Sequence, residues 1–171
     1  MYTSLVLLAL TGFTSSAENV EAPSWQTDYS LAKKQGEGDK KPVAVFIGSG
    51  KEGWDKLVRK GSLGKEHLKA LANSYVCLYL DTTTPDGKRM AKLLDINNGL
   101  GLVISDHTGA VMAFHHEGDL ASADLAKYLT RFADPERVVR TTETNPGTQS
   151  RSYYYPPTPT YQPVYSSGRS C

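Results

Sequence analysis

The stretch KPVAVFIGSGKEGWDKL, residues 41–57, decides the fold of this chain. Residues 43–47 are an uninterrupted run of β-branched, small apolar and aromatic side chains, which is typical of a strand buried on both faces of a sheet. Two glycines then allow a tight turn, after which Trp54, Leu57 and Val58 recur at helical spacing. The stretch therefore predicts a central strand, a turn and the start of a helix.

This unit resembles the active-site segment of thioredoxin-like proteins, in which a lysine-proline pair leads the central strand and a Cys-x-x-Cys motif opens the next helix. Lys41 and Pro42 match the pair, whereas Glu52 and Asp55 stand where the family keeps its redox cysteines. Disulfide exchange needs a reactive thiolate and a second thiol beside it. We interpret Glu52 and Asp55 as carboxylates stabilised by unpaired N–H groups at a helix start, with a catalytic acid pair as the alternative.

The resemblance also implies a loop facing this motif, where the family has a cis-proline and this chain has Leu100. A cis bond before a residue other than proline costs about 2.5–4 kcal/mol, so we expect a trans bond there. The ligand groove would then be reshaped and formed by Trp54, Gly99 and Leu100. Because the cysteines and the proline are both replaced, we expect relaxed redox function.

The elements around the central strand follow from apolar periodicity and turn residues. The first predicted element is a helix led by Trp25, Asp28, Tyr29 and Ala32, which breaks at residues 36–39 before the strand 43–47. After this strand we predict a helix from Glu52, a helix at 65–73, a strand at 75–80 parallel to the first strand, and a helix at 87–94. The last predicted elements are antiparallel strands at 100–105 and 111–115, joined by the loop 106–109, and a helix at 122–133.

This order matches the thioredoxin-like fold over residues 24–134. The predicted fold class is therefore α/β, a thioredoxin-like three-layer α/β/α sandwich with a central mixed sheet of about four strands and a disordered C-terminal tail. A length of 171 residues with 39% hydrophobic content suits one such domain plus extensions. We assign residues 1–17 to a signal peptide, 18–138 to the domain and 139–171 to the tail.

The N-terminal assignment rests on an apolar run at residues 5–13 followed by Ser15, Ser16 and Ala17, which suits cleavage after Ala17. It predicts a secreted or periplasmic protein. No Lys or Arg precedes the run, so a loosely docked N-terminus is the alternative. No later segment approaches the roughly 20 apolar residues of a membrane helix, so we predict no integral membrane segment in the mature chain.

The tail is rich in Tyr, Pro, Thr and Ser and lacks helical or alternating periodicity. Such a segment buries too little apolar surface to offset the entropy of ordering, so disorder is predicted. It serves either as an inert spacer or as a contact surface, since tyrosine rings bind at low entropic cost.

The two cysteines, Cys77 and Cys171, have different expected roles. Cys77 lies in an apolar strand, where a thiol acts as a small buried hydrophobe. Cys171 ends the chain and is either an intermolecular disulfide partner in an oxidising compartment or an unpaired thiol.

Three histidines and a glutamate, His107, His115, His116 and Glu117, suggest a metal site at first sight. Neighbouring strand residues point to opposite faces, so His115 and His116 cannot chelate one ion together, and we predict a solvated strand terminus and no metal. The net charge of +1 gives no field that would favour nucleic acid.

These observations predict an exported, non-redox thioredoxin-like domain that acts as a protein-binding or structural module, without a cofactor and without catalytic residues. The alternative is a thiol-disulfide oxidoreductase or related redox protein that uses Cys77 or Cys171, with a cysteine of a partner.

Overall fold

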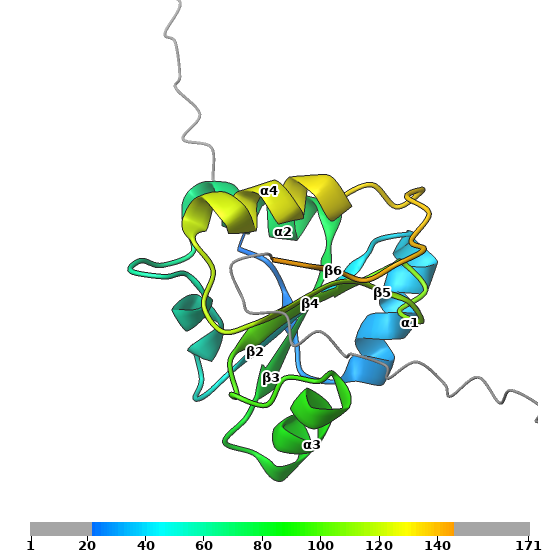
Figure 1. The fold of residues 1–171 in the computed structure, drawn as a ribbon. Coiled ribbons are helices and arrows are strands. Elements are labelled where there is room, and N and C mark those ends of the chain that lie inside the picture. Colours follow the sequence, from blue (N-terminus) through cyan, green and yellow to red (C-terminus); the bar gives the residue numbers. More distant parts are fainter. Residues whose placement is uncertain (1–21, 146–171) are drawn as a thin grey trace, which may run out of the picture.

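A six-stranded mixed sheet with four α-helices forms the structure, a computed structural model that describes residues 22–145 (Figure 1). The strands are β1 (Trp25–Gln26), β2 (Val43–Gly48), β3 (Val76–Asp81), β4 (Gly101–Ser105), β5 (Met112–Glu117) and β6 (Glu143–Thr144). The helices are α1 (Tyr29–Asp39), α2 (Lys65–Ser74), α3 (Pro85–Leu93) and α4 (Ser122–Phe132), with the short 3₁₀ helix η1 (Gly53–Leu57) after β2.

The strand order is β1-β3-β2-β4-β5-β6. β1, β3 and β2 are parallel to one another, as predicted for the two long strands, and the β4–β5 hairpin is antiparallel, also as predicted. The sheet has six strands instead of about four, because β1 and β6 add one at each edge. Each of these has two residues, too few to leave a periodic pattern in the sequence.

The helices cover both faces of the sheet, with α2 and α4 on one side and α1 and α3 on the other (Figure 1). Ala44 and Phe46 of β2 belong to the core between the sheet and helices α2 and α4. The alternate residues Val43, Val45 and Ile47 belong to the core on the opposite face, between the sheet and helices α1 and α3. This two-sided burial explains why β2 is apolar at every position.

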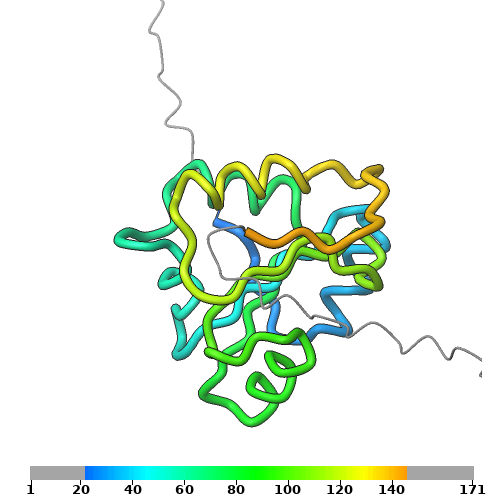
Figure 2. The backbone as a smooth tube through the Cα atoms, in the orientation of Figure 1, coloured from blue at the N-terminus to red at the C-terminus, as the bar shows by residue number. Residues whose placement is uncertain are grey.

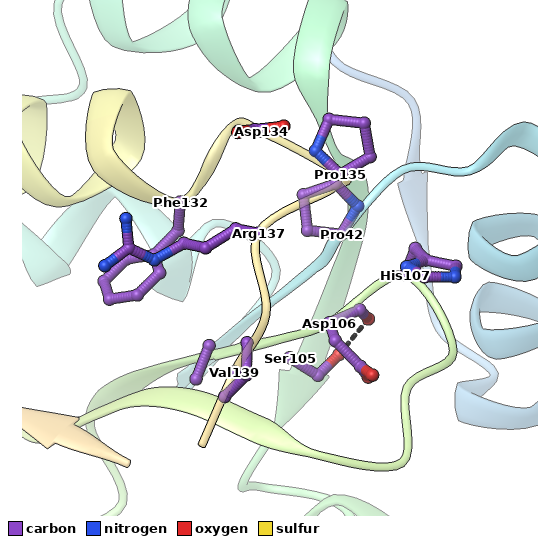
Figure 3. A pocket seen from close by; sticks show the side chains of 10 residues that line it. Pro42, Ser105, Asp106, His107, Phe132, Asp134, Pro135, Arg137 and Val139 are labelled. Carbon is purple, nitrogen blue, oxygen red and sulfur yellow. Dashed lines mark hydrogen bonds between the residues drawn. The ribbon is translucent and has the colours of Figure 1, made fainter. Parts of the chain in front are cut away.

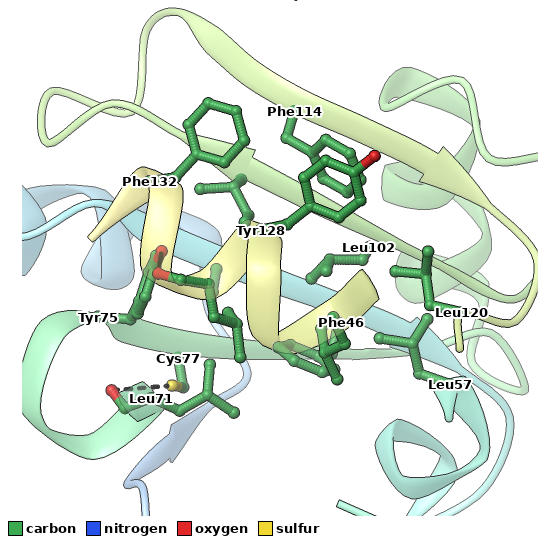
Figure 4. Close-up of a cluster of buried hydrophobic side chains, with 14 of the residues drawn as sticks. Phe46, Leu57, Leu71, Tyr75, Cys77, Leu102, Phe114, Leu120, Tyr128 and Phe132 are labelled. Carbon is green, nitrogen blue, oxygen red and sulfur yellow. Dashed lines mark hydrogen bonds between the residues drawn. The ribbon is translucent and has the colours of Figure 1, made fainter. Parts of the chain in front are cut away.

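The core beneath α4 is built around stacked aromatic rings (Figure 4). Phe114 of β5 lies 4.1 Å from the Tyr128 ring and 5.9 Å from the Phe132 ring, measured between centroids. Tyr75 is anchored by a 2.6 Å hydrogen bond from its hydroxyl to the Leu129 carbonyl oxygen. These contacts fix α4 on the sheet.

The first helix differs from its prediction at both ends. Trp25 lies in β1, and the helix begins after Asp28, whose carboxylate accepts hydrogen bonds from the amides of residues 30 and 31. The helix also continues through Gly36 to Asp39. Gly36 is buried, and a Cβ there would lie 2.9 Å from the Lys41 carbonyl oxygen. This glycine therefore permits close packing and does not break the helix.

The helix predicted from Glu52 is wrong in type and length. The structure has only η1, after which Val58 is extended and forms an isolated bridge with Leu120. The amide of Leu120 donates to the Leu57 carbonyl oxygen and the amide of Arg59 donates to the Leu120 carbonyl oxygen, each at 2.7 Å. These long-range hydrogen bonds end η1 after five residues.

Residues 139–145, which the sequence analysis assigned to the tail, contact the domain. Val139 packs against the core, and β6 pairs with β5. Figure 2 shows the backbone of this last described segment running beside β5. One packed apolar side chain and a two-residue strand are too little to give a recognisable sequence pattern. The predicted signal peptide, Cys171 and the rest of the predicted tail lie outside the described residues.

We predict that ending the chain after Asn145 leaves the melting temperature within about 2 °C of that of the mature full-length protein, because residues 146–171 lack a core-forming pattern. Ending it after Arg137 should lower the melting temperature by several degrees, since Val139 and β6 are then lost. Differential scanning calorimetry of the three chains measures this. A clear drop for the chain ending at Asn145 would contradict the prediction.

Candidate functional site

The turn that leaves β2 is built on two glycines in direct backbone contact. A Cβ on Gly48 would collide with the backbone of Gly53, and a Cβ on Gly53 would collide with the Tyr79 hydroxyl oxygen. Between them, Gly50 has φ +89, in the left-handed region that favours glycine. The sequence GSGKEG therefore allows this tight exit because glycine occupies all three positions.

Side chains of the neighbouring strand β3 hold this turn in place. The Gly50 amide donates to Asp81 Oδ1 at 2.9 Å, and the Tyr79 hydroxyl donates to the Gly50 carbonyl oxygen. Hydrogen bonds from Thr83 and from the Gly50 amide lower the pKa of the Asp81 carboxyl below its usual value. The sequence analysis missed both residues. Their signal was their position at the end of a strand parallel to β2, with Gly48 in register with Asp81.

The two carboxylates Glu52 and Asp55 have different surroundings. Asp55 lies in the first turn of η1, but its Oδ1 accepts a 2.7 Å hydrogen bond from the amide of Leu63, eight residues further on. Glu52 is exposed and its side chain makes no capping hydrogen bond. Both carboxylates therefore stand at the start of η1, but Glu52 makes no capping hydrogen bond and Asp55 accepts from a residue outside η1. Asp55 ties η1 to the loop that precedes α2.

The loop predicted to face the turn does lie beside it, joined through Thr82. The Thr82 hydroxyl is 3.0 Å from the Gly48 carbonyl oxygen and 3.4 Å from that of Gly99. The peptide bond before Leu100 is trans, as expected, and Gly99 has φ +71. The structure therefore brings Gly99 and Leu100 next to the end of β2.

Trp54, the third residue of the predicted groove, contacts Trp25 of β1. Its ring stacks on Trp25 at 5.1 Å between centroids with 21° between the planes, and Trp25 meets Phe46 edge-on at 5.1 Å. Both tryptophans are partly buried against the core under α2 and α4. They form a half-exposed aromatic pair, which brings β1 and η1 together.

One described pocket gathers a serine, an aspartate and a histidine, Ser105, Asp106 and His107 (Figure 3). The Asp106 carboxylate accepts hydrogen bonds from the Thr108 hydroxyl and from the amides of residues 110 and 111, so it shapes the hairpin loop. The Ser105 hydroxyl donates to the Asp106 carbonyl oxygen at 3.2 Å. These contacts assign the cluster a structural role in the hairpin.

The adjacent histidines of β5 have separate partners. His115 Nε2 lies 3.2 Å from the Asp95 carbonyl oxygen, and His116 Nε2 lies 3.1 Å from that of Asp119. Both residues are within the strand, and His116 is 5% exposed, so the predicted solvated terminus is wrong for His116. Burial lowers its pKa below the usual value. Within residues 22–145, no cluster of three or more His, Cys, Asp or Glu side chains could hold a metal ion.

Cys77 is buried in β3, as predicted. Only 2% of its surface is exposed, and its Sγ donates to the Leu71 carbonyl oxygen at 3.8 Å. A pocket lined partly by Gln26 and Lys41 lies beside it, but the thiol barely reaches that space. Burial raises the pKa of the thiol to about 12, so almost no thiolate forms near neutral pH.

Comparison with known proteins yields no family model and no curated protein that matches this chain. None of the helices within residues 22–145 has the length and apolar character needed to cross a membrane.

Proposed function

We propose that this protein is an exported, non-redox thioredoxin-like domain that binds a protein partner at the surface formed by the β2 turn, Trp54 and the loop at Leu100. The observation that carries the proposal is the β2 turn itself. Hydrogen bonds with Tyr79 and Asp81 of β3 support this turn, and Glu52 and Asp55 follow it at the positions where, by the resemblance, disulfide exchange would need thiols.

The order of elements supports the thioredoxin-like part of this proposal. Helix α1, strand β2, the short η1 with α2, strand β3, helix α3, the β4–β5 hairpin and helix α4 follow one another as in the resemblance described above. The lysine-proline pair leads the central strand, and the loop at Leu100 reaches the end of β2 through Thr82. These are the positions that the family uses for its motif and its facing loop.

Support for binding comes from the combination of a rigid backbone and partly exposed aromatic rings. Hydrogen bonds with Tyr79, Asp81 and Thr82 fix the turn, so little entropy is lost when a partner contacts it. The half-exposed Trp54 is of the residue type most enriched at the centres of interfaces.

Quantitative capture from the exported fraction of the native source tests the binding function. The wild-type chain should retain a specific partner that Trp54→Ala loses. Leu93→Ala, which removes an exposed apolar side chain from α3, should retain it. Circular dichroism must show that both variants are folded. Equal recovery by all three chains, or no partner for any, would argue against the proposed surface.

Mass spectrometry of the exported chain, expected to begin at Glu18, tests the localisation.

The alternative, an oxidoreductase that uses Cys77, predicts a reactive thiol. Because the pKa of Cys77 is raised to about 12, its thiolate fraction at pH 8 is on the order of 10⁻⁴. In a Cys171→Ser variant, which leaves Cys77 as the only thiol, we therefore expect a disulfide reagent to react at least about 100-fold more slowly than with a free thiol. Full reactivity should return in denaturant. A fast reaction in the folded variant would favour the oxidoreductase.

A further inference from the structure

The last described segment, residues 138–145, lies along the outer edge of β5, and we call it the strap (Figure 2). Its two-residue strand β6 pairs in parallel with Phe114 and His115. The Thr142 hydroxyl adds a 2.9 Å hydrogen bond to the Met112 carbonyl oxygen. On its inner edge, by contrast, β5 pairs with β4 along nearly its whole length. The outer edge is thus covered only in part by the described residues.

Glu143 is the charged anchor of the strap. Its Oε1 lies 2.8 Å from Arg131 Nη2 on α4 and 3.5 Å from Arg137 Nη2 in the turn after α4. All three side chains are between 30% and 44% exposed. Ion pairs at such exposure contribute about 0–1 kcal/mol each and weaken as salt is added.

The apolar anchorage of the strap is small. Val139 packs against the core, whereas the neighbouring Val138 is 75% exposed. Val139 also lines the pocket in Figure 3, together with Phe132 and Ser105, so packing around this one strap residue is incomplete. A segment with few buried apolar contacts and exposed hydrogen bonds is the kind that opens locally before the domain unfolds.

Each arginine also contacts the Phe132 ring, which lies outside the strap. The guanidinium of Arg131 lies 5.9 Å from the Phe132 ring centroid and that of Arg137 lies 5.2 Å from it. The amide of Arg137 also donates to the Asp134 carbonyl oxygen at 3.2 Å. A chain without the strap in place would therefore present a sheet edge with two cations beside it.

We propose that the outer edge of β5 is a docking site for an extended segment of a partner protein that carries a carboxylate and displaces the strap. Main-chain hydrogen bonds to β5 would supply affinity, as in other cases of strand addition. A carboxylate between Arg131 and Arg137 would set the register. The strap, with Glu143 in that place, is the intramolecular competitor. The site lies at another part of the sheet from the β2 turn and does not depend on the function proposed there.

A peptide with the sequence of residues 138–145 is the probe, labelled for fluorescence anisotropy and tested on the full chain. Glu143→Lys places a third cation beside Arg131 and Arg137 and should release the strap. Glu136→Lys, an equal charge change in the preceding exposed turn, is the matched control. Hydrogen exchange of the β5 amides reports release of the strap directly.

We expect the peptide to bind the Glu143→Lys chain at least about tenfold more tightly than the wild-type or Glu136→Lys chains, because a tethered strap competes at an effective concentration on the order of millimolar. The same peptide with Glu143→Gln should bind more weakly. Unchanged β5 exchange in Glu143→Lys would overturn the proposal, as would faster exchange without peptide binding. A dimer of Glu143→Lys that blocks the peptide would assign the edge to a second copy of this chain and also contradict it.

Discussion

Replacing Phe114 with alanine should lower the free energy of unfolding by about 3–5 kcal/mol, a large share of the stability of a domain of this size. The side chain is fully buried and stacks on Tyr128 at 4.1 Å, so its removal costs both the transfer of the ring from water and a cavity between β5 and α4. Urea denaturation followed by fluorescence measures the change, with an unaltered slope confirming that the unfolding reaction is the same.

The control for this variant is Val111→Ala. Val111 lies directly before β5 and is 42% exposed, so its truncation should cost about 0.5 kcal/mol or less. A loss below about 1 kcal/mol for Phe114→Ala would mean that the stacked aromatic cluster is not the main contact between β5 and α4.

Replacing Gly53 with alanine should lower the free energy of unfolding by about 2–3 kcal/mol. The added Cβ meets the Tyr79 hydroxyl and lies 3.0 Å from the Gly48 carbonyl carbon, and the glycine backbone opposite cannot retreat without disrupting β2. The variant should also weaken partner capture, because the β2 turn must move.

Gly38→Ala provides the opposite result. Gly38 lies in α1 with open space around its Cβ position, so alanine there should stabilise the protein by about 0.5–1 kcal/mol. Thermal melts of both variants test the pair. If Gly53→Ala is as stable as the wild-type protein, the close contact between Gly48 and Gly53 does not shape the turn.

The parts of the fold that the sequence predicts are those with long apolar patterns. β2, β3, the β4–β5 hairpin and α4 all bury at least four side chains at regular spacing, and each lies within two residues of its predicted bounds. The edge strands β1 and β6 have two residues each and form only because a neighbouring strand offers hydrogen bonds. No local pattern records such pairing.

The sequence predicted which residues of the β2 segment belong to the candidate site, but not the residues of other strands that contact them. The resemblance located Glu52, Asp55 and Leu100, and the structure places Leu100 beside the β2 turn. The supports Tyr79 and Asp81 come from another strand, and they meet the turn because β3 is in register with β2. Likewise, the η1 segment stops because Val58 bridges to Leu120, more than sixty residues away. Such contacts depend on tertiary structure, which periodicity does not encode.

The double variant Glu52→Cys with Asp55→Cys tests the central claim, that the β2 turn has the geometry of a thioredoxin-like motif without its thiols. Glu52 is the N-cap of η1, and its carbonyl oxygen accepts a 3.1 Å hydrogen bond from the Asp55 amide. The two residues therefore span one 3₁₀ turn, a rise of about 6 Å, which is within the Cα separation that a disulfide spans. We therefore expect an internal disulfide under mild oxidation, seen as the loss of two free thiols without dimerisation.

The loss of the Asp55 hydrogen bond to the Leu63 amide should lower stability by only about 1 kcal/mol, so the variant should fold. Reductase activity should stay poor, because Leu100 does not provide the proline-shaped loop, and Leu100→Pro added to the pair should raise it. Free-thiol titration of the folded double variant is the decisive measurement. The predicted result is the loss of both introduced thiols within the monomer. If both introduced thiols stay free in a folded protein, that result contradicts the thioredoxin-like assignment.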